Sequence, residues 1–271
     1  MISTARAYAS RAFAALLLAL AATLPAVAGQ LLPHRAVYTL SLARAGEPSG
    51  IAGARGALGI EWSEGCDGWI VHQRIRLALI SESSGELKTE TGFTSWESKD
   101  GLKYRFSMRT LHDGEVTEQL EGEAEVSGGG GEGEARFVRP SGHKVKLPKG
   151  SVFPTKHTIE LLERAEAGEN GLLRIVFDGA TREGMAEVNA VIGSLRPAAQ
   201  PADERNELTN RPLWPMRLAF FQLDDGSEQP HYELSVQLLD NGVANELIMD
   251  YGDFAIRATL DKIEAVPTPM C

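Results

Sequence analysis

Two cysteines are the residues of this sequence best suited to a covalent cross-link. Cys66 lies in a turn-rich stretch, Glu-Gly-Cys-Asp-Gly, and Cys271 is the last residue, after Pro-Thr-Pro-Met. In an exported chain, an even number of cysteines predicts one disulfide, and two unrelated thiols are the alternative. The sequence has no Cys-x-x-Cys pair, so it favours neither a thioredoxin-like redox site nor a zinc ribbon.

The polar residues match no catalytic motif. The chain lacks the sequences G-x-S-x-G, H-E-x-x-H and G-K-[ST], which mark nucleophile elbows, zinc proteases and phosphate loops. His157 and Glu160 are spaced for one face of a helix, but two ligands do not make a metal site. A histidine packed or capped at the start of a helix is the preferred interpretation. We therefore expect no catalytic residue, no metal site, no cofactor and no enzymatic activity.

A glycine run and two acidic turns resemble ligand-binding loops only in part. Gly128, Gly130 and Gly133 fit G-x-G-x-x-G, but the strand–turn–helix setting of a dinucleotide site is missing and nearby glutamates would repel a pyrophosphate. The stretches 224–226 and 250–253 contain paired aspartates without the spacing of a twelve-residue calcium loop. Ordinary turns are the preferred interpretation of both.

Four tryptophans are the strongest candidates for an apolar binding surface. They are Trp62, Trp69, Trp96 and Trp214. Such residues could line a ligand groove, but aromatic side chains of this size more often belong to a core. A core position is therefore the preferred interpretation.

Composition and charge narrow the class of protein. The chain has 271 residues, of which 43% are hydrophobic, which excludes a wholly disordered chain and allows a sizeable core. The formal net charge is −10. Binding to nucleic acid needs a basic face, so nucleic acid is not an expected partner. The same charge disfavours permanent attachment to an anionic membrane.

The N-terminal segment has the features of a signal peptide. Arg6 and Arg11 precede an apolar run, residues 12–24, and Ala26-Val27-Ala28 fits an A-x-A cleavage site. The run is too short to span a bilayer, which needs about 20 residues; an uncleaved anchor is the alternative. We expect residues 1–28 to be removed, leaving 29–271 as a soluble exported protein with no membrane span.

The remainder of the chain predicts many short antiparallel strands. Apolar residues alternate with polar ones in several segments, as at Tyr104, Phe106 and Met108, which is typical of a sheet with one wet face. Turn dipeptides such as Asp113-Gly114 and Asn241-Gly242 separate these segments. Roughly a dozen or more strands are expected. A sheet of so many strands should curl or close into a barrel-like form.

One helix and two loops interrupt the strand pattern. Thr155 is a candidate N-cap and Gly168 a stop signal, and the expected apolar face holds Ile159, Leu162 and Ala165. The helix should pack onto or into the curved sheet. The glycine run, 128–133, and the Pro-rich stretch, 194–212, are expected loops. The second should be mobile and protease-sensitive, because it has too few apolar residues to dock. The second could mark a domain boundary, but a single domain over 29–271 is preferred.

Several stretches, taken in order, resemble the EipB-like cell-envelope-integrity family of proteobacterial periplasmic proteins. The matching stretches are Cys66–Trp69, Phe93–Gly101, Tyr104–Phe106, Phe153–Thr158, Val176–Gly179, Trp214–Arg217, Asn241–Val243, Asp250–Phe254 and Cys271. They extend over about residues 34–271. The glycine run and the Pro-rich stretch depart from the pattern.

This resemblance implies a spiral of antiparallel strands around one α-helix, tied by a disulfide between Cys66 and Cys271. It also implies a periplasmic, non-enzymatic protein, long assigned to a domain of unknown function, that maintains the cell envelope through protein contacts. The implied partner is a periplasmic protein with helical repeats of the TPR kind. Two hypotheses remain: a monomeric scaffold, or a carrier that holds a lipid acyl chain or lipoprotein in its curved sheet.

Overall fold

The computed structural model describes residues 31–83, 85–198, 206–223 and 228–271. The predicted signal peptide, 1–28, and one expected turn, Asp225-Gly226, lie outside these residues. Within them, no helix is both long enough and apolar enough to cross a membrane.

Fourteen strands of the described chain form one antiparallel sheet. The first eight are β1 (His34–Ala45), β2 (Ile51–Glu64), β3 (Gly68–Ser81), β4 (Gly85–Ser98), β5 (Lys103–His112), β6 (Glu115–Val126), β7 (Gly133–Arg139) and β8 (Lys144–Leu147). After the helix α1 (Pro154–Glu166) come β9 (Gly171–Phe177), β10 (Met185–Ile192), β11 (Leu213–Gln222), β12 (Tyr232–Leu239), β13 (Ala244–Asp250) and β14 (Phe254–Ala265). A 3-10 turn, Glu47–Ser49, joins β1 to β2.

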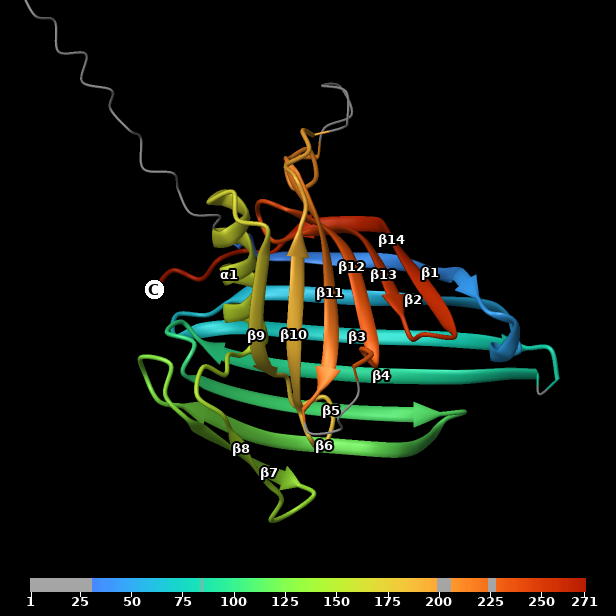
Figure 1. Ribbon diagram of the computed structural model, residues 1–271, viewed down its shortest axis with the longest axis horizontal. Coiled ribbons are helices and arrows are strands. Elements are labelled where there is room, and N and C mark those ends of the chain that lie inside the picture. Colours follow the sequence, from blue (N-terminus) through green and yellow to red (C-terminus); the bar gives the residue numbers. More distant parts are fainter. Residues whose placement is uncertain (1–30, 84, 199–205, 224–227) are drawn as a thin grey trace, which may run out of the picture.

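The chain winds outward from β1 and returns to it. Strands β1 to β8 follow one another across the sheet, and β9 to β14 lead back until β14 pairs with β1. The two edge strands are therefore β8 and β9, which are connected through α1. In Figure 1, β9 to β12 cross in front of β2 to β6, so the sheet curls over itself with the helix at one end.

The curl is nearly closed beside the helix. Val152, just before α1, forms a parallel bridge with Val176 of the edge strand β9. The backbone hydrogen bonds of this bridge run from Val152 to Ile175 and from Phe177 to Val152, at 2.9 and 3.0 Å. The prediction of an all-β, curled, barrel-like antiparallel sheet around one helix is therefore confirmed.

The alternation of the strands builds the core. On β5, Tyr104, Phe106 and Met108 are buried while the residues between them are exposed. They belong to an aromatic cluster in which the ring centroids of Tyr104 and Phe153 lie 5.0 Å apart, and those of Phe106 and Phe177 lie 5.6 Å apart. Offset and edge-to-face contacts of this kind stabilise a core beyond the area that they bury.

The turns follow the predicted chemistry. Asp113 and Gly114 have φ angles of 48° and 88° between β5 and β6, which are the left-handed values that a tight hairpin requires. Asn241-Gly242 joins β12 to β13, with a φ of 85° at the glycine.

The N-terminus of the helix differs from the prediction. Pro154 is the first helical residue and Phe153 holds the cap position without a side-chain hydrogen bond, so the assignment of Thr155 as N-cap is wrong. Thr155 is instead buried in the first turn. Leu162 and Ala165 are buried as expected, whereas Ile159 is only half-buried.

The Pro-rich stretch, 194–212, is docked at its described flanks. Arg196 forms an antiparallel bridge with Leu213, the Asn241 side chain donates to the carbonyl oxygen of Leu208 at 2.9 Å, and Arg211 pairs with Asp240. The expectation of an undocked loop is therefore wrong for these flanks, because polar contacts replace the missing apolar ones. Residues 199–205 lie outside the described chain.

We predict that Leu162→Ala lowers the free energy of unfolding by about 2–5 kcal/mol, since the side chain is 1% exposed in the core. Glu163→Ala, on the exposed side of the same helix, is the matched control and should change it by less than about 0.5 kcal/mol. Chemical denaturation of both variants measures the effect. Equal stabilities would show that α1 is peripheral to the fold.

Candidate functional site

The interior of the curled sheet has a closed end at the helix and a more open end at the far hairpins. At the closed end, the buried α1 residues Leu161, Leu162 and Ala165 pack in one cluster with Trp69 and Trp214. Trp62 is partly buried against the same cluster. Three of the four tryptophans thus serve the core as predicted, and they pack with the helix inside this end of the sheet.

Trp96 differs from the other three. It is half-buried on β4, where the Arg105 guanidinium carbon lies 4.8 Å from the centroid of its ring. Alternation along the strand turns it away from the core, because its neighbours Ser95 and Glu97 are the buried ones. Its position belongs to the outer face of the sheet.

A buried carboxylate fastens the helix to the sheet. Glu97 of β4 is 2% exposed and accepts hydrogen bonds from the backbone N–H groups of Thr155 and Lys156 at 2.7 and 2.8 Å. These N–H groups have no partner within the helix, so an acceptor from another strand satisfies them. Desolvation outweighs these hydrogen bonds and raises the pKa of Glu97 to about 7. No local motif marked this role, since Glu97 lies among polar residues near the end of β4.

His157 and Glu160, the two residues considered above as metal ligands, contact different surroundings. His157 is buried, and its Nε2 atom has no hydrogen-bond partner among the described residues, while burial lowers its pKa to about 4. Glu160 instead accepts from Arg174 of β9 at 2.7 Å. No group of three or more metal-binding side chains occurs in the described residues, so nothing brings further ligands to His157.

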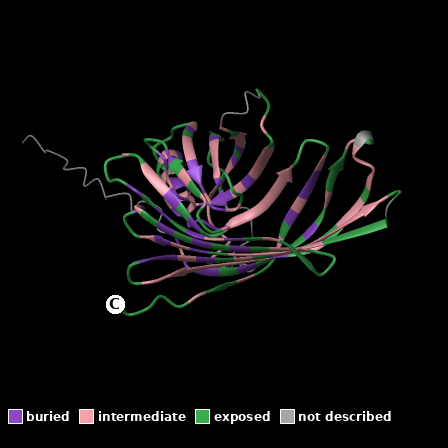
Figure 2. Ribbon diagram, turned by 90° about the horizontal axis from the view of Figure 1, so that it is seen from below, coloured by how far each residue is buried: buried purple, intermediate pink, exposed green. Residues whose placement is uncertain are grey.

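The open end of the sheet carries apolar side chains that are only partly covered. Leu42, Leu77, Leu79 and Met249 surround the buried centre of this region, and Leu87 on the β3–β4 hairpin is 45% exposed. In Figure 2, buried residues concentrate near the helix, whereas the far hairpins are intermediate or exposed. This end could accept an apolar group without rearrangement of the helix.

Four aromatic rings form a chain of contacts that joins two hairpins. The centroids of Phe220 and Tyr232 lie 5.0 Å apart, those of Tyr232 and Tyr251 5.3 Å, and those of Tyr251 and Phe254 5.2 Å. Tyr251 is 45% exposed. The rings therefore stiffen the junction of β11–β12 with β13–β14 and still present apolar surface to solvent.

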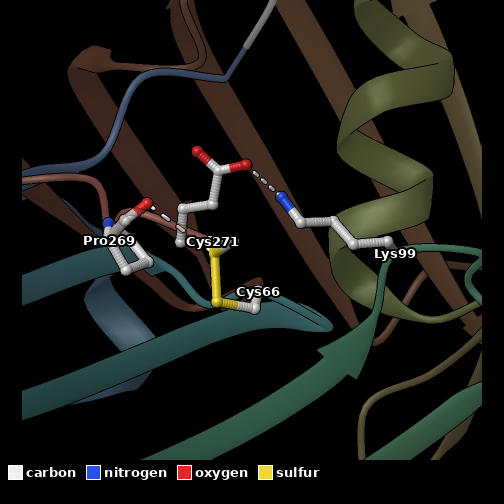
Figure 3. The surroundings of a disulfide bond; sticks show 5 residues. Cys66, Lys99, Pro269 and Cys271 are labelled. Carbon is white, nitrogen blue, oxygen red and sulfur yellow. Dashed lines mark hydrogen bonds and ion pairs between the residues drawn. A yellow bond between two sulfur atoms is a disulfide. The ribbon is translucent and has the colours of Figure 1, made fainter.

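The two cysteines meet at the edge of the closed end. Cys66, in the β2–β3 turn, is joined to Cys271 by a disulfide with a Cα–Cα distance of 5.6 Å, and Figure 3 shows the bond beside the chain terminus. Lys99 lies next to it, with its ammonium group 3.6 Å from the centroid of the Trp69 ring and paired with Glu64. The bond thus connects the end of the chain to the turn that precedes the core residue Trp69.

We predict that loss of the disulfide lowers the free energy of unfolding by a few kcal/mol without changing the fold. The bond closes a loop with a sequence separation of 205, for which the chain-entropy model gives at most about 5 kcal/mol. Thiol labelling of the denatured, non-reduced protein, followed by melting with and without reductant, measures the effect. The Cys66→Ser/Cys271→Ser variant should be insensitive to reductant; two labelled cysteines in the untreated protein would contradict the bond.

We predict that Glu97→Gln changes how stability depends on pH. In the folded state the pKa of Glu97 is about 7, above its ordinary value of 4.5. Protonated Glu97 therefore contributes to the free energy of unfolding fully below about pH 4.5, and this contribution is lost as the pH rises to 7. Because glutamine does not titrate, the free energy of unfolding of the variant should rise by about 3 kcal/mol relative to that of wild type between pH 4.5 and pH 7. Urea unfolding at several pH values tests this, with exposed Glu123→Gln as control. Parallel pH curves for wild type and Glu97→Gln would contradict it.

Comparison with known proteins gives one consistent result. The model of the EipB-like family matches residues 25–267. The cell envelope integrity protein EipB of Brucella abortus (strain 2308) is 32% identical over 251 residues, which cover 90% of this chain and 87% of that protein. A crystal structure of a β-barrel-like protein of a domain of unknown function from Brucella abortus superposes with a TM-score of 0.80 at 30% identity, over 88% of this chain and 99% of the other. The sequence pattern, the fold and these matches agree, and the chain belongs to the EipB-like family.

Proposed function

We propose that this protein is exported to the periplasm and maintains the integrity of the cell envelope as a non-enzymatic scaffold. The observation that carries the proposal is the closed end of the sheet, where α1, Trp69 and Trp214 occupy the interior. With that space filled, contacts with another molecule fall to the outer surface and the open end. The Brucella abortus relative is named for envelope integrity, which supports the same role here.

The proposed partner is a periplasmic protein built of helical repeats of the TPR kind, as the family resemblance implies. Stacked helical repeats form extended concave surfaces, and the outer face of a curled sheet is convex. The fourteen-stranded sheet thus offers a long outer surface that such a partner could follow. The protein itself is proposed to act as a monomer.

A carrier of a lipid acyl chain or lipoprotein is the second candidate. The partly covered Leu77, Leu79 and Met249, together with the exposed Leu87 and Tyr251, favour it. These residues lie at the open end, which the helix does not fill. A carrier would use this end, whereas a scaffold would not need it to be apolar.

We predict that deletion of the gene from its source bacterium makes the cells sensitive to detergent and to cell-wall antibiotics, and that a plasmid copy restores resistance. The copy must retain residues 1–28, because a version without them should stay in the cytoplasm and fail to restore resistance. Intact-mass measurement of the periplasmic protein locates the mature N-terminus. Full rescue by the version without residues 1–28 would overturn the periplasmic role.

The same strain separates the scaffold from the carrier. Leu79→Asp/Met249→Asp places charges at the open end, while Thr39→Asp and Thr259→Asp, on the exposed outer face of β1 and β14, are matched controls. A scaffold should still restore resistance with the open-end variant, provided that its melting temperature is close to wild type. Loss of rescue, together with loss of lipid from the purified protein in native mass spectrometry, would favour the carrier.

A further inference from the structure

The outer face of β3, β4 and β5 is basic, although the whole chain carries a net charge of −10. The outward positions of these strands hold the basic residues His72, Arg74, Arg76, Lys88, Arg105 and Arg109, and the acidic residues Glu86 and Glu90. A local excess of positive charge on an acidic protein concentrates anions at that place.

Gly92 lies at the centre of this face. In the strand register it pairs with Arg74 of β3 on one side and with Arg109 of β5 on the other. Neighbouring strands lie about 4.8 Å apart, so the backbones of the two arginines flank a residue that has no side chain. A Cβ atom added to Gly92 would meet no heavy atom within 4 Å, and the space above the backbone is therefore open.

The geometry of the sheet does not require glycine at this position. The pairing of β4 with β3 and with β5 continues through Gly92 without a register shift, so no bulge is present. A glycine inside a regular strand weakens it, and otherwise marks the close approach of a ligand or of another backbone. An outward glycine between two arginines therefore points to something that is bound against the backbone.

The surroundings supply further donors and a shallow hollow. Thr94 and Ser107 face one another in the adjoining row, and the Thr94 hydroxyl lies 3.1 Å from Nδ1 of His72. A hollow of about 550 Å³ begins at Gly92 and Thr94 and extends over β3 and β2 to β1, so it adjoins Arg74 but not the β5 residues. Hydroxyl donors beside arginines are the usual complement of an oxyanion.

The nearby charges leave the two arginines available. Glu90 Oε1 lies 3.5 Å from Nε of Arg74, and its Oε2 lies 3.3 Å from Nε of Arg76, so one exposed carboxylate is shared between two guanidinium groups. Two flanking carboxylates, Glu61 beside His72 and Glu121 beside Ser107, are paired with Arg35 and Arg139. Among the described residues, Arg109 has no acidic partner within 4.0 Å. Exposed pairs such as Arg74–Glu90 contribute little, so an incoming dianion can compete with Glu90.

We propose that Arg74, Gly92, Thr94, Ser107 and Arg109 form a binding site for a phosphate group on the outer face of the sheet. The inference goes beyond the proposed function, because it assigns a ligand site to this face. A carboxylate has two oxygens, which a single guanidinium can satisfy as a bidentate pair. Two guanidinium groups from the strands on either side of Gly92, with the hydroxyls of Thr94 and Ser107 beside them, instead suit the three free oxygens of a phosphate monoester.

Nuclear magnetic resonance titration of the full mature chain tests the site. The probes are sodium phosphate, dihexanoyl phosphatidic acid below its micelle concentration, and sodium succinate, all at constant ionic strength set with sodium chloride. We expect saturable shifts of the Gly92 amide and of the Arg74 and Arg109 Nε signals with either phosphate probe. Saturation by phosphatidic acid alone would support the site and identify its source as a lipid headgroup. Succinate that binds as tightly as phosphate would overturn the proposal in favour of an acidic peptide.

Two variants isolate the site from the fold. Gly92→Val keeps both arginines and fills the open space, and β-branched residues favour strands, so melting should not fall while phosphate affinity drops at least about tenfold. Ala57→Val, on the same outer face of β2, is its control and should bind as wild type does. Arg74→Gln/Arg109→Gln should abolish saturation, whereas Arg217→Gln on β11 should not. Unchanged phosphate affinity in Gly92→Val or in the double arginine variant would overturn the site.

Discussion

The pairing of β1 with β14 holds the two halves of the molecule together. His34 pairs with Ala265 and Leu40 with Ala258, so segments from opposite ends of the chain form the middle of the sheet. Every other pair of neighbouring strands in the sheet is consecutive in the chain. The long-range step, and with it the cost of loop closure, is therefore concentrated in one place.

The disulfide and the ion pairs act at that same seam. Arg35 of β1 donates to both Glu61 of β2 and Glu264 of β14. Beyond the end of β14, at Ala265, the chain reaches Cys271 and its bond to Cys66. Terminal strands fray unless they are tied down. A tether after the end of β14 thus protects the one pairing on which the sheet depends, which gives the bond a structural purpose.

The two ends of the curled sheet differ in what they can do. At the helix end, Glu97 holds the first turn of α1 and the aromatic cluster fills the interior, so this end is built for rigidity. The open end keeps Leu87 and Tyr251 partly exposed. The outer face of β3 to β5 adds a third kind of surface, which is basic and, at Gly92, bare of side chains. Contacts with a partner, with an apolar group and with an anion can thus be made on separate regions.

Local sequence determined the strands, their turns and the class of fold. The alternation at Tyr104, Phe106 and Met108 needs only a wet face and a dry one, and Asp113-Gly114 needs only a positive φ, so both can be read from neighbouring residues. The single helix and the curling of so many strands followed from the same patterns. The link between Cys66 and Cys271 followed from their count together with the family resemblance.

Tertiary structure alone decided which polar groups are buried and what they contact. Glu97 caps a helix that begins 57 positions later, at Pro154, so no local pattern marks it. Thr155 was expected to make that cap, and the carboxylate from β4 made its hydroxyl unnecessary there. His157 and Glu160 share a helix but face different surroundings, one the core and the other Arg174. In each case the deciding contact comes from another element of the fold, and only the folded chain brings such partners together.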